Sequence, residues 1–498
     1  MVSAVRLLGA EQALVDGLPD WRAVDQPKLW RYNLHYFDYL LWPAVAERRK
    51  AALIDSWIAE NPPGSPDAWE PYPVSLRIVN WVKRLSAGGV AQEAPARWLE
   101  SLGLQAAWLE RNLEREILAN HYLKNAKALV FAGLFFQGRD ADRWLQLGSR
   151  ILREQIREQF LPDGGHFELS PMYHALCLED LLDVCNLAEG SDRGVDRGLR
   201  TEIEGTARRA LDFLAAILLP NGEIPLFNDA AFGIAPTPAA LFDYAGRLLG
   251  YQRPADPRRA LLDSGYFRLG DGPDRMIIDC GPVSPSYQPG HTHCDMLSYE
   301  LALDGRPIVV DTGVYDYEPS AERAWSRSTR AHNTVGVDGV EQSEVWGVFR
   351  VARRARPCLA ELAPHADQGA RFVGELEGFP SVAGRIRHRR AVVYEPPAVW
   401  RVEDRVSGSG RHDLDSWVHL HPDWSAEIKG GTVVVADRAG TVGALIEPQP
   451  GVAVCVETGQ YFPCFGTKLS NQVVRLSARG PLPITFGYVI RKARATDV

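Results

Sequence analysis

A short segment that reads Gln-Pro-Gly-His-Thr-His-Cys-Asp places His291, His293 and Asp295 at every second position. On an extended strand alternate side chains point to the same face, so we expect these three to converge. Two imidazoles and a carboxylate can bind zinc and leave a fourth position for water. Asp311 and His332, further along the chain, strengthen this hypothesis of a metal or catalytic site. The alternative is a set of inert, hydrogen-bonded polar residues at the interface of a sheet domain.

Two other segments carry side chains that could move protons. Asn120 and His121 open an apolar segment, where Asn120 is well suited to cap a helix and His121 falls in the first turn. Residues 163–174 read Asp-Gly-Gly-His-Phe-Glu-Leu-Ser-Pro-Met-Tyr-His. Its Ser-Pro pair favours the start of a helix, which places Tyr173 in the first turn. Glu168 and Asp229 are candidate acids that keep a hydrolase among the alternatives.

Aromatic and polar side chains are dense between residues 30 and 81, where Trp69 and Glu70 stand side by side. A cleft lined by flat apolar faces and fixed polar groups suits a carbohydrate. The competing interpretation is a packed core, because buried tryptophan and tyrosine are normal in globular proteins.

Two kinds of hydrophobic periodicity divide the chain. Up to about residue 250 apolar residues recur every three or four positions, and one such stripe covers residues 98–117. Further helices are predicted near 36–59, 74–86, 122–136, 140–160, 172–188, 198–218 and 237–249. From about residue 262 the period is two, as in 275–280, 297–303, 306–310, 392–403, 432–435 and 473–476, which predicts stacked antiparallel sheets. We expect an α+β chain with a helical domain over 1–255 and a sheet domain over 262–498, joined by a linker at 250–257.

Composition, net charge and cysteine spacing exclude several classes of protein. The 498 residues are 46% apolar and 24% charged, which indicates a globular chain of two or three domains. The net charge of −8 argues against general binding to nucleic acid or anionic membranes. No apolar run approaches the roughly 20 residues of a membrane span, and no secretory signal is visible, so we expect a cytoplasmic protein by default. Seven scattered cysteines predict free thiols. The oligomeric state is not indicated.

The order of these motifs resembles that of the heparinase II/III-like polysaccharide lyases, which include related alginate lyases. The shared features are the Asn-His helix, Gly-Gly-x-Phe-Glu-x-Ser-Pro-x-Tyr-His, His-x-His-x-Asp, Asp-x-Gly-x-Tyr and Arg-x-His-Asn. Residues 29–37 resemble the N-terminal signature of bacterial members, and the likeness spans roughly residues 28–420. The resemblance implies an N-terminal incomplete (α/α) toroid followed by a C-terminal antiparallel β-sandwich. It also implies an anionic polysaccharide or oligosaccharide as substrate.

The resemblance further implies roles for individual residues. Asn120 corresponds to the asparagine that binds the uronate carboxylate, His121 to the active-site histidine beside it, Tyr173 to the catalytic tyrosine, and His291 to the histidine that the sandwich contributes. The implied ligands of a structural zinc ion are His293, Asp311 and His332, and no organic cofactor is expected. The implied substrate-binding residues are Tyr315, Arg327, Arg330, Lys124, Trp69 and Glu70. Lys124 stands where some relatives have a glutamate, which favours a more anionic substrate.

The implied reaction is β-elimination at a uronic acid. Asn120 and an arginine such as Arg327 would neutralise the carboxylate, so that the proton at C5 can leave. Tyr173 would protonate the departing oxygen and, in some stereochemistries, also take the C5 proton. A tyrosine that ionises near neutrality needs a cationic neighbour, for which His121 and His291 are the candidates. The alternatives are a glycoside hydrolase on a helical toroid and a non-catalytic glycan-binding protein.

Overall fold

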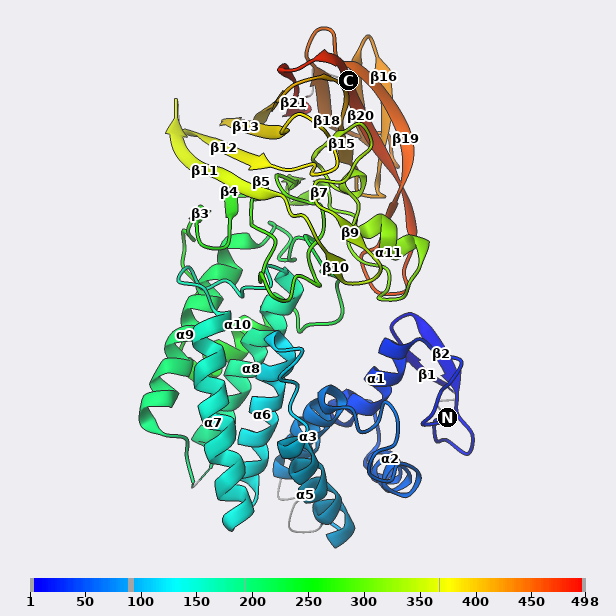
Figure 1. The fold of residues 1–498 in the computed structure, drawn as a ribbon, viewed down its shortest axis with the longest axis vertical. Coiled ribbons are helices and arrows are strands. Elements are labelled where there is room, and N and C mark those ends of the chain that lie inside the picture. The colour runs from blue at the N-terminus through cyan, green and yellow to red at the C-terminus, as the bar shows by residue number, and fades with distance from the viewer. Residues whose placement is uncertain (1–3, 88–93, 192, 367, 495–498) are drawn as a thin grey trace. The chain divides into compact units, whose positions relative to one another are not determined.

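The computed structural model describes residues 4–87, 94–191, 193–366 and 368–494 (Figure 1). The chain divides into two compact units. The first, here called the helical unit, comprises residues 1–159, 177–208 and 247–250. The second, here called the sheet unit, comprises residues 160–176, 209–246 and 251–498. Parts of three helices, at residues 171–176, 209–217 and 238–246, thus belong to the sheet unit, although they precede its strands in the sequence.

Helices dominate the chain up to residue 249, as the periodicity predicts. A small hairpin, β1 (Ala4–Leu7) and β2 (Ala10–Ala13), comes first. The helices are α1 (Lys28–Tyr36), η1 (Asp38–Leu41), α2 (Glu47–Glu60), α3 (Pro71–Ser86), α5 (Ala96–Arg111), α6 (Ala119–Phe135), α7 (Arg139–Gln159), α8 (Pro171–Glu189), α9 (Arg197–Ile217) and α10 (Pro238–Leu249). In the helical unit α6 packs against α7 and α3 and is buried on nearly every face, which explains its apolar sequence.

The predicted helix over 36–59 is wrong at its start. Helix α1 ends at Tyr36, and Phe37 takes a left-handed conformation with φ of 65°. Only a short 3₁₀ turn follows before α2 begins at Glu47. A left-handed residue cannot continue a right-handed helix, so the single segment becomes two helices.

The apolar stripe over 98–117 also overruns its helix, because α5 ends at Arg111. Leu118 has a φ of 62°, and α6 begins immediately after it at Ala119. Asn120 is therefore a buried residue of the first turn and not the N-cap that the sequence predicts. The cap position falls on Leu118, whose side chain makes no capping hydrogen bond.

The sheet unit is built from antiparallel ladders. Its elements after α10 are β3 (Ala260–Leu261), β4 (Tyr266–Asp271), β5 (Asp274–Asp279), β6 (Tyr299–Leu303), β7 (Arg306–Val309), α11 (Ala321–Ser326), η3 (Thr329–Ala331), β8 (Val335–Val337), β9 (Val345–Trp346), β10 (Arg350–Val351), β11 (Arg356–His365), β12 (Gly369–Glu377), β13 (Arg387–Glu395), β14 (Val399–Ser407), β15 (Arg411–His419), β16 (Trp424–Lys429), β17 (Thr432–Asp437), β18 (Val442–Pro448), β19 (Ala453–Tyr461), β20 (Leu469–Pro481) and β21 (Ile484–Lys492). The larger sheets have the orders β11-β12-β13-β14-β21-β18-β17-β16, β19-β20-β15-β8 and β3-β4-β5-β6-β7.

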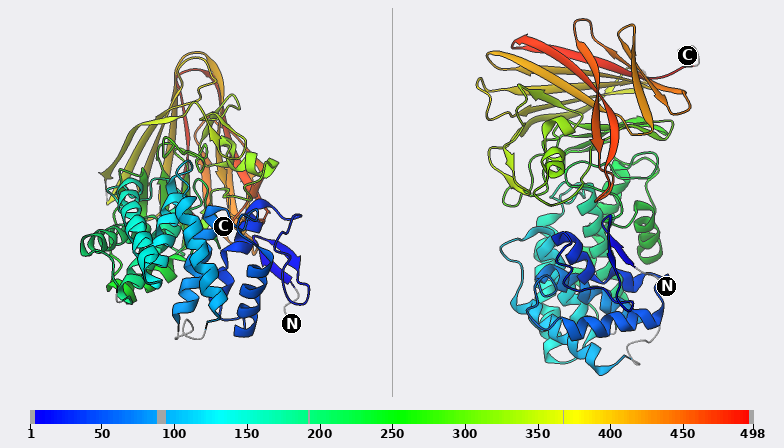
Figure 2. Two further views of the ribbon diagram at one scale, coloured as in Figure 1. Left: turned by 60° about the horizontal axis from the view of Figure 1, so that its bottom comes forward. Right: turned by 90° about the vertical axis from the view of Figure 1, so that its right-hand side faces the viewer.

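One hydrophobic core joins these three sheets, which stack in layers (Figure 2). Along β14 Trp400, Val402 and Val406 point into this core, whereas Arg401 and Arg405 face solvent. This alternation is the period of two seen in the sequence.

Two strand predictions fail. The single strand predicted over 392–403 is two strands, β13 and β14, because Pro396 and Pro397 lie between them and proline cannot donate to a ladder. The segment that carries His291, His293 and Asp295 is an irregular loop and not an extended strand. The three side chains therefore need another explanation for their positions.

Two further sequence predictions concern cysteines and membranes. All seven cysteines are free thiols in the structure, as predicted. Within the described ranges, no helix has both the length and the apolar character that crossing a bilayer requires.

Candidate active site

A buried carboxylate, Asp229, organises the candidate site of the sheet unit. It lies in the loop between α9 and α10, and its side chain is fully buried. His291 Nδ1 donates to Asp229 Oδ2 at 2.8 Å, and His293 Nε2 donates to Oδ1 at 2.7 Å. Arg323, from α11, forms a two-pronged ion pair with the same carboxylate. Asp229 thus fixes both imidazoles in place of the strand geometry that the sequence predicts.

Electrostatics keep Asp229 ionised. Burial alone would raise the pKa of Asp229, but the Arg323 guanidinium and the two imidazole hydrogen bonds hold it well below its usual range. Burial lowers the pKa of His293 to about 3, so this imidazole is neutral. His293 therefore donates one N–H to Asp229 and keeps its second nitrogen, Nδ1, for another partner.

Tyr173 lies against His291. Their rings are 4.0 Å apart, centroid to centroid, at an angle of 32°. The Tyr173 hydroxyl is 3.3 Å from that of Tyr317. Ser170 caps α8 as the sequence predicts: its Oγ accepts from the Tyr173 N–H at 3.3 Å and donates to the Asp229 carbonyl at 2.6 Å. The first turn of α8 is thereby tied to the loop of Asp229, the residue to which His291 is hydrogen-bonded.

The Tyr173–His291 pair combines two side chains that can carry a proton. Burial, and then the neighbouring Tyr317 and Asp229, raise the pKa of Tyr173 well above 10. The phenol of Tyr173 therefore carries its proton at neutral pH, which suits a proton donor. His291 Nε2, the nitrogen that Asp229 does not hold, lies 3.9 Å from the Glu168 carboxylate.

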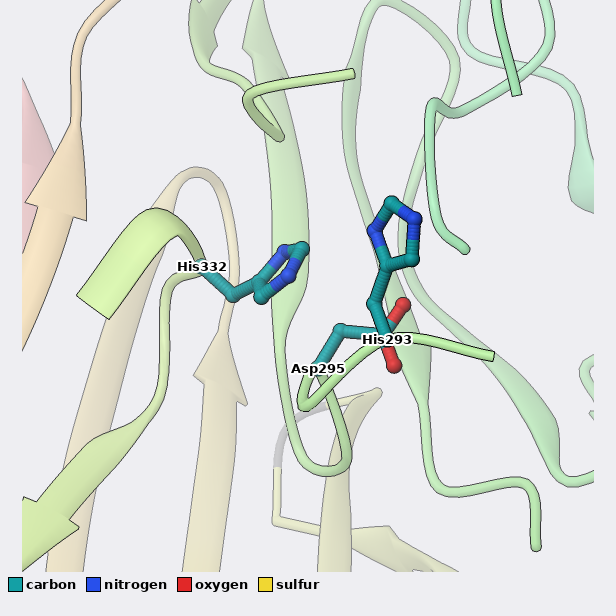
Figure 3. Close-up of side chains that lie close together, drawn as sticks. All are labelled: His293, Asp295 and His332. Atoms are coloured by element: carbon teal, nitrogen blue, oxygen red, sulfur yellow. The ribbon is translucent and has the colours of Figure 1, made fainter. Parts of the chain in front are cut away.

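A second group of side chains has the geometry of a metal site. The ligand atoms of His293, Asp295 and His332 all lie within 4.8 Å of one another, and all three residues are buried (Figure 3). His293 Nδ1 and His332 Nε2 are both buried and make no hydrogen bond. Unpaired buried nitrogens are costly in a folded protein, so the donor set fits a bound cation.

Asp311 does not belong to this ligand group. Its Oδ2 accepts from His332 Nδ1 at 2.8 Å and thereby turns His332 Nε2 toward the other two residues. Of the predicted ligands, His293 and His332 fall in this group, which contains Asp295 in place of Asp311. Asp311 instead has the orienting role that carboxylates often play behind metal-binding histidines.

In the helical unit a second histidine is paired with a carboxylate. His121 Nδ1 lies 2.9 Å from Glu114 Oε1, and Asn125 donates to Glu114 Oε2 at 2.9 Å. The His121 side chain is 27% exposed and its ring packs on Tyr72 with centroids 4.3 Å apart. Asn120 precedes it and is buried. Glu114 thus fixes the orientation of a half-buried imidazole.

Three of the predicted substrate-binding residues belong to the helical unit. Lys124 is buried, and its ammonium pairs with Asp180 at 2.7 Å, so it is a structural ion pair and not an open anion site. Trp69 is buried between Trp57 and Trp108 and is part of the core. Glu70 remains partly exposed and accepts hydrogen bonds from Tyr32 and Lys28.

The other three belong to the sheet unit. Arg327 is 1% exposed, and the hydrogen bonds of its guanidinium go to main-chain carbonyl oxygens, so it cannot bind a substrate carboxylate. Arg330 is exposed and lies over the Trp325 ring at 4.7 Å. Tyr315 is partly buried beside Phe462.

Sequence reasoning missed four residues of these sites. Asp229 was considered only as a hydrolase acid, whereas Glu114, Tyr317 and Arg323 were not singled out. Tyr317 stands two residues after Tyr315, and the repeat of tyrosines could have drawn attention to it. Glu114 and Arg323 carry no local signal, because their partners lie 7 to 94 positions away.

Comparison with known proteins assigns both the N-terminal and the C-terminal part of the chain to the same family. The family model described as heparinase II/III-like, C-terminal, matches residues 253–495, and the model of the heparinase II/III N-terminus matches residues 46–237. A heparin-sulfate lyase of Pedobacter heparinus is 28% identical over 406 residues, which cover 74% of this chain and 57% of the relative. The chain spans about half the length of the curated relatives that it matches.

Solved structures share the fold. The crystal structure of a heparinase III matches with a TM-score of 0.76 and 20% identity over 96% of this chain and 80% of that one. A heparan sulfate lyase mutant from Pedobacter heparinus gives a TM-score of 0.68 and 20% identity over 98% and 80% of the two chains. The predicted fold class, a helical (α/α) toroid followed by an antiparallel β-sandwich, is confirmed.

Proposed function

Because the chain belongs to the heparinase II/III-like family, we propose that it is a polysaccharide lyase that cleaves a uronate-containing glycosaminoglycan by β-elimination. The observation that carries this proposal is the Tyr173–His291 pair anchored on Asp229. It combines the protonated phenol of Tyr173 with an imidazole whose Nε2 is not bound to Asp229.

His291 acts as the base in this proposal. In a uronic acid the C5–H is acidic because it lies next to the carboxylate, and its removal gives an enolate-like intermediate. The Nδ1–H of His291 is held by Asp229, so the Nε2 lone pair accepts the C5 proton. The Glu168 carboxylate, 3.9 Å from Nε2, stabilises the imidazolium that forms.

Tyr173 acts as the acid. The C4–O bond breaks as the C4–C5 double bond forms, and the departing oxygen takes the phenol proton. The raised pKa of Tyr173 keeps that proton available at neutral pH. Tyr317, with its hydroxyl 3.3 Å away, can donate a hydrogen bond to the phenolate that remains. The product carries an unsaturated uronate at its new non-reducing end.

The enolate requires neutralisation of the substrate carboxylate. On the family resemblance we assign this role to Asn120 and His121, with Glu114 holding the imidazole in orientation. Arg330 is the exposed arginine of the predicted set and replaces the buried Arg327 as the candidate cation.

We also propose that His293, Asp295 and His332 hold a zinc ion. The two unpaired imidazole nitrogens and the carboxylate support this assignment. When bound, the ion would cross-link the loop of His293 and Asp295 to the segment that ends in His332. Its role would be structural: it would fix His293, which hydrogen-bonds to Asp229, the carboxylate that positions His291.

A glycoside hydrolase would need two available carboxylates. Asp229, one of the two candidates for that role, is fully buried and already binds two imidazoles and one guanidinium. It can neither attack a sugar nor donate a proton. This weakens the hydrolase alternative and leaves the lyase as the better explanation of the site.

Heparan sulfate is the first substrate to test, since the curated relatives are named heparin-sulfate lyases. The experiment measures ultraviolet absorbance of unsaturated uronate with heparan sulfate, chondroitin sulfate and alginate. Wild type, Tyr173→Phe and His291→Ala are compared. We expect turnover by wild type on at least one uronate polymer and loss in both variants. Full activity in either variant would exclude the assigned acid or base, and turnover of none of the polymers would support a glycan-binding protein.

A further inference from the structure

A small hairpin of the sheet unit presents two exposed aromatic side chains. Strands β9 and β10 pair with Trp346 opposite Arg350, and Gly347 turns the chain with a φ of 55°. Trp346 is 54% exposed and Phe349 is 42% exposed. Exposed apolar side chains that form a patch mark binding sites more often than single exposed ones do.

Two buried arginines hold this hairpin in place. Arg323 donates from Nε and Nη2 to the Val348 carbonyl at 3.0 and 2.8 Å. Arg327 donates to the carbonyls of Trp346, Gly347 and Arg350 at 3.4, 3.3 and 3.1 Å. A ribbon with two-residue strands is not stable alone. Two buried guanidiniums are a costly means of fixing it, which indicates that its position matters.

The hairpin adjoins the Tyr173–His291 pair through Phe349. The Phe349 ring is 6.2 Å from the His291 ring and 5.3 Å from the Tyr317 ring. Gly290, the residue before His291, also lies beside Phe349. Arg323 reaches both Asp229 and the hairpin, so one guanidinium sets the positions of the imidazole and of the aromatic ring.

We propose that Phe349 is a sugar-binding platform next to the Tyr173–His291 pair, on which the pyranose ring adjoining the cleaved linkage packs, and that Trp346 extends it along the polysaccharide. This subsite rests on the proposed lyase function for the identity of its occupant. One face of a pyranose ring is formed by C–H groups, and a half-exposed aromatic ring offers a matching apolar surface. The separation of 6.2 Å between the Phe349 and His291 rings is comparable to the length of one sugar unit in a chain.

The test measures binding separately from turnover. Calorimetric titration with a heparan sulfate tetrasaccharide is done on Tyr173→Phe protein, which keeps the ring beside His291 but lacks the proposed acid. Adding Phe349→Ala should raise the Kd about tenfold, the size expected for a lost aromatic contact. Phe349→Tyr should bind like the parent, and Phe349→Leu should be as weak as the alanine variant, because the flat ring and not apolarity alone is needed.

Ile428→Ala is the matched control, since Ile428 is also 42% exposed and lies on β16 of the same unit. It should leave the Kd unchanged. Equal Kd values for Phe349→Ala and the parent, or no saturable binding by the parent, would overturn the platform. The proposed function fails on a different result: retained turnover when Tyr173→Phe is introduced alone.

Discussion

Replacing Asp229 with asparagine tests whether one buried carboxylate positions the catalytic imidazole. Its two oxygens accept from His291 Nδ1 at 2.8 Å and from His293 Nε2 at 2.7 Å, while Arg323 neutralises the charge. Asparagine has nearly the same shape, but only its oxygen accepts. One imidazole would then face an N–H₂ group and must lose its hydrogen bond or change tautomer.

The expected losses of stability and of kcat in Asp229→Asn follow from these contacts. Arg323 would remain buried without its counterion, and breaking a buried ion pair costs about 3–5 kcal/mol of unfolding free energy. A misoriented base should lower kcat by about 10²- to 10⁴-fold. The pKa of Asp229 is depressed in the folded state, so the stability difference between wild type and variant is fully present above about pH 4. It shrinks as the pH falls through the folded-state pKa.

Asp404→Asn supplies the control. Asp404 is equally buried in the sheet unit and accepts from His388 Nε2 and from Arg390 Nε, both at 2.8 Å. The Asp404→Asn substitution should lower the free energy of unfolding by a similar amount. It should leave the kcat of the folded protein near the wild-type value. The assays are denaturant unfolding at several pH values and ultraviolet-detected turnover on heparan sulfate. The reasoning would be refuted if Asp229→Asn kept its kcat, or if both variants lost the same fraction of it.

Four further predictions use other features of the site. Because burial keeps the Tyr173 phenol protonated, kcat/KM should not decline between about pH 8 and 10; a decline that Tyr173→Phe abolishes would contradict this. Removing metal with a chelator, or introducing His332→Ala, should lower the Tm, and zinc should restore the chelated protein but not the variant; metal analysis that finds no bound ion would refute the site. Trp69→Ala should cost about 3–5 kcal/mol of stability without a specific rise in KM, as expected of a core residue. Glu114→Gln should lower kcat more than it raises KM, and Glu114→Asp should recover part of the loss, whereas a fall in stability alone would point to a purely structural role.

The sequence predicted the architecture because both periodicities follow from burial. Apolar stripes at helical spacing and alternation along strands such as β14 reflect which face meets the core. The errors fall where one residue overrides the pattern. Phe37 takes a left-handed conformation that ends a helix, and Pro396 and Pro397 divide one predicted strand into two.

The candidate site was less accessible to sequence reasoning, because its residues are defined by distant partners. Tyr173 and His291 stand within recognisable motifs, and the structure brings their rings together. Arg327 was expected to bind substrate, yet its donors are taken up by carbonyls of residue 292 and of the hairpin at 346–350. Lys124 likewise pairs with Asp180, 56 residues away. Residue type alone does not distinguish a buried charge with a partner from an open one.

Incubating the protein with heparan sulfate in water enriched in heavy oxygen, followed by mass spectrometry of the products, tests the central claim most directly. β-Elimination breaks the C4–O bond without adding water. Apart from the exchange of reducing-end oxygen with water, the product masses should therefore sum to the mass of the substrate, and one product should absorb in the ultraviolet. Product masses that sum to the substrate plus one water for each cleavage, without this absorbance, would show hydrolysis and contradict the account.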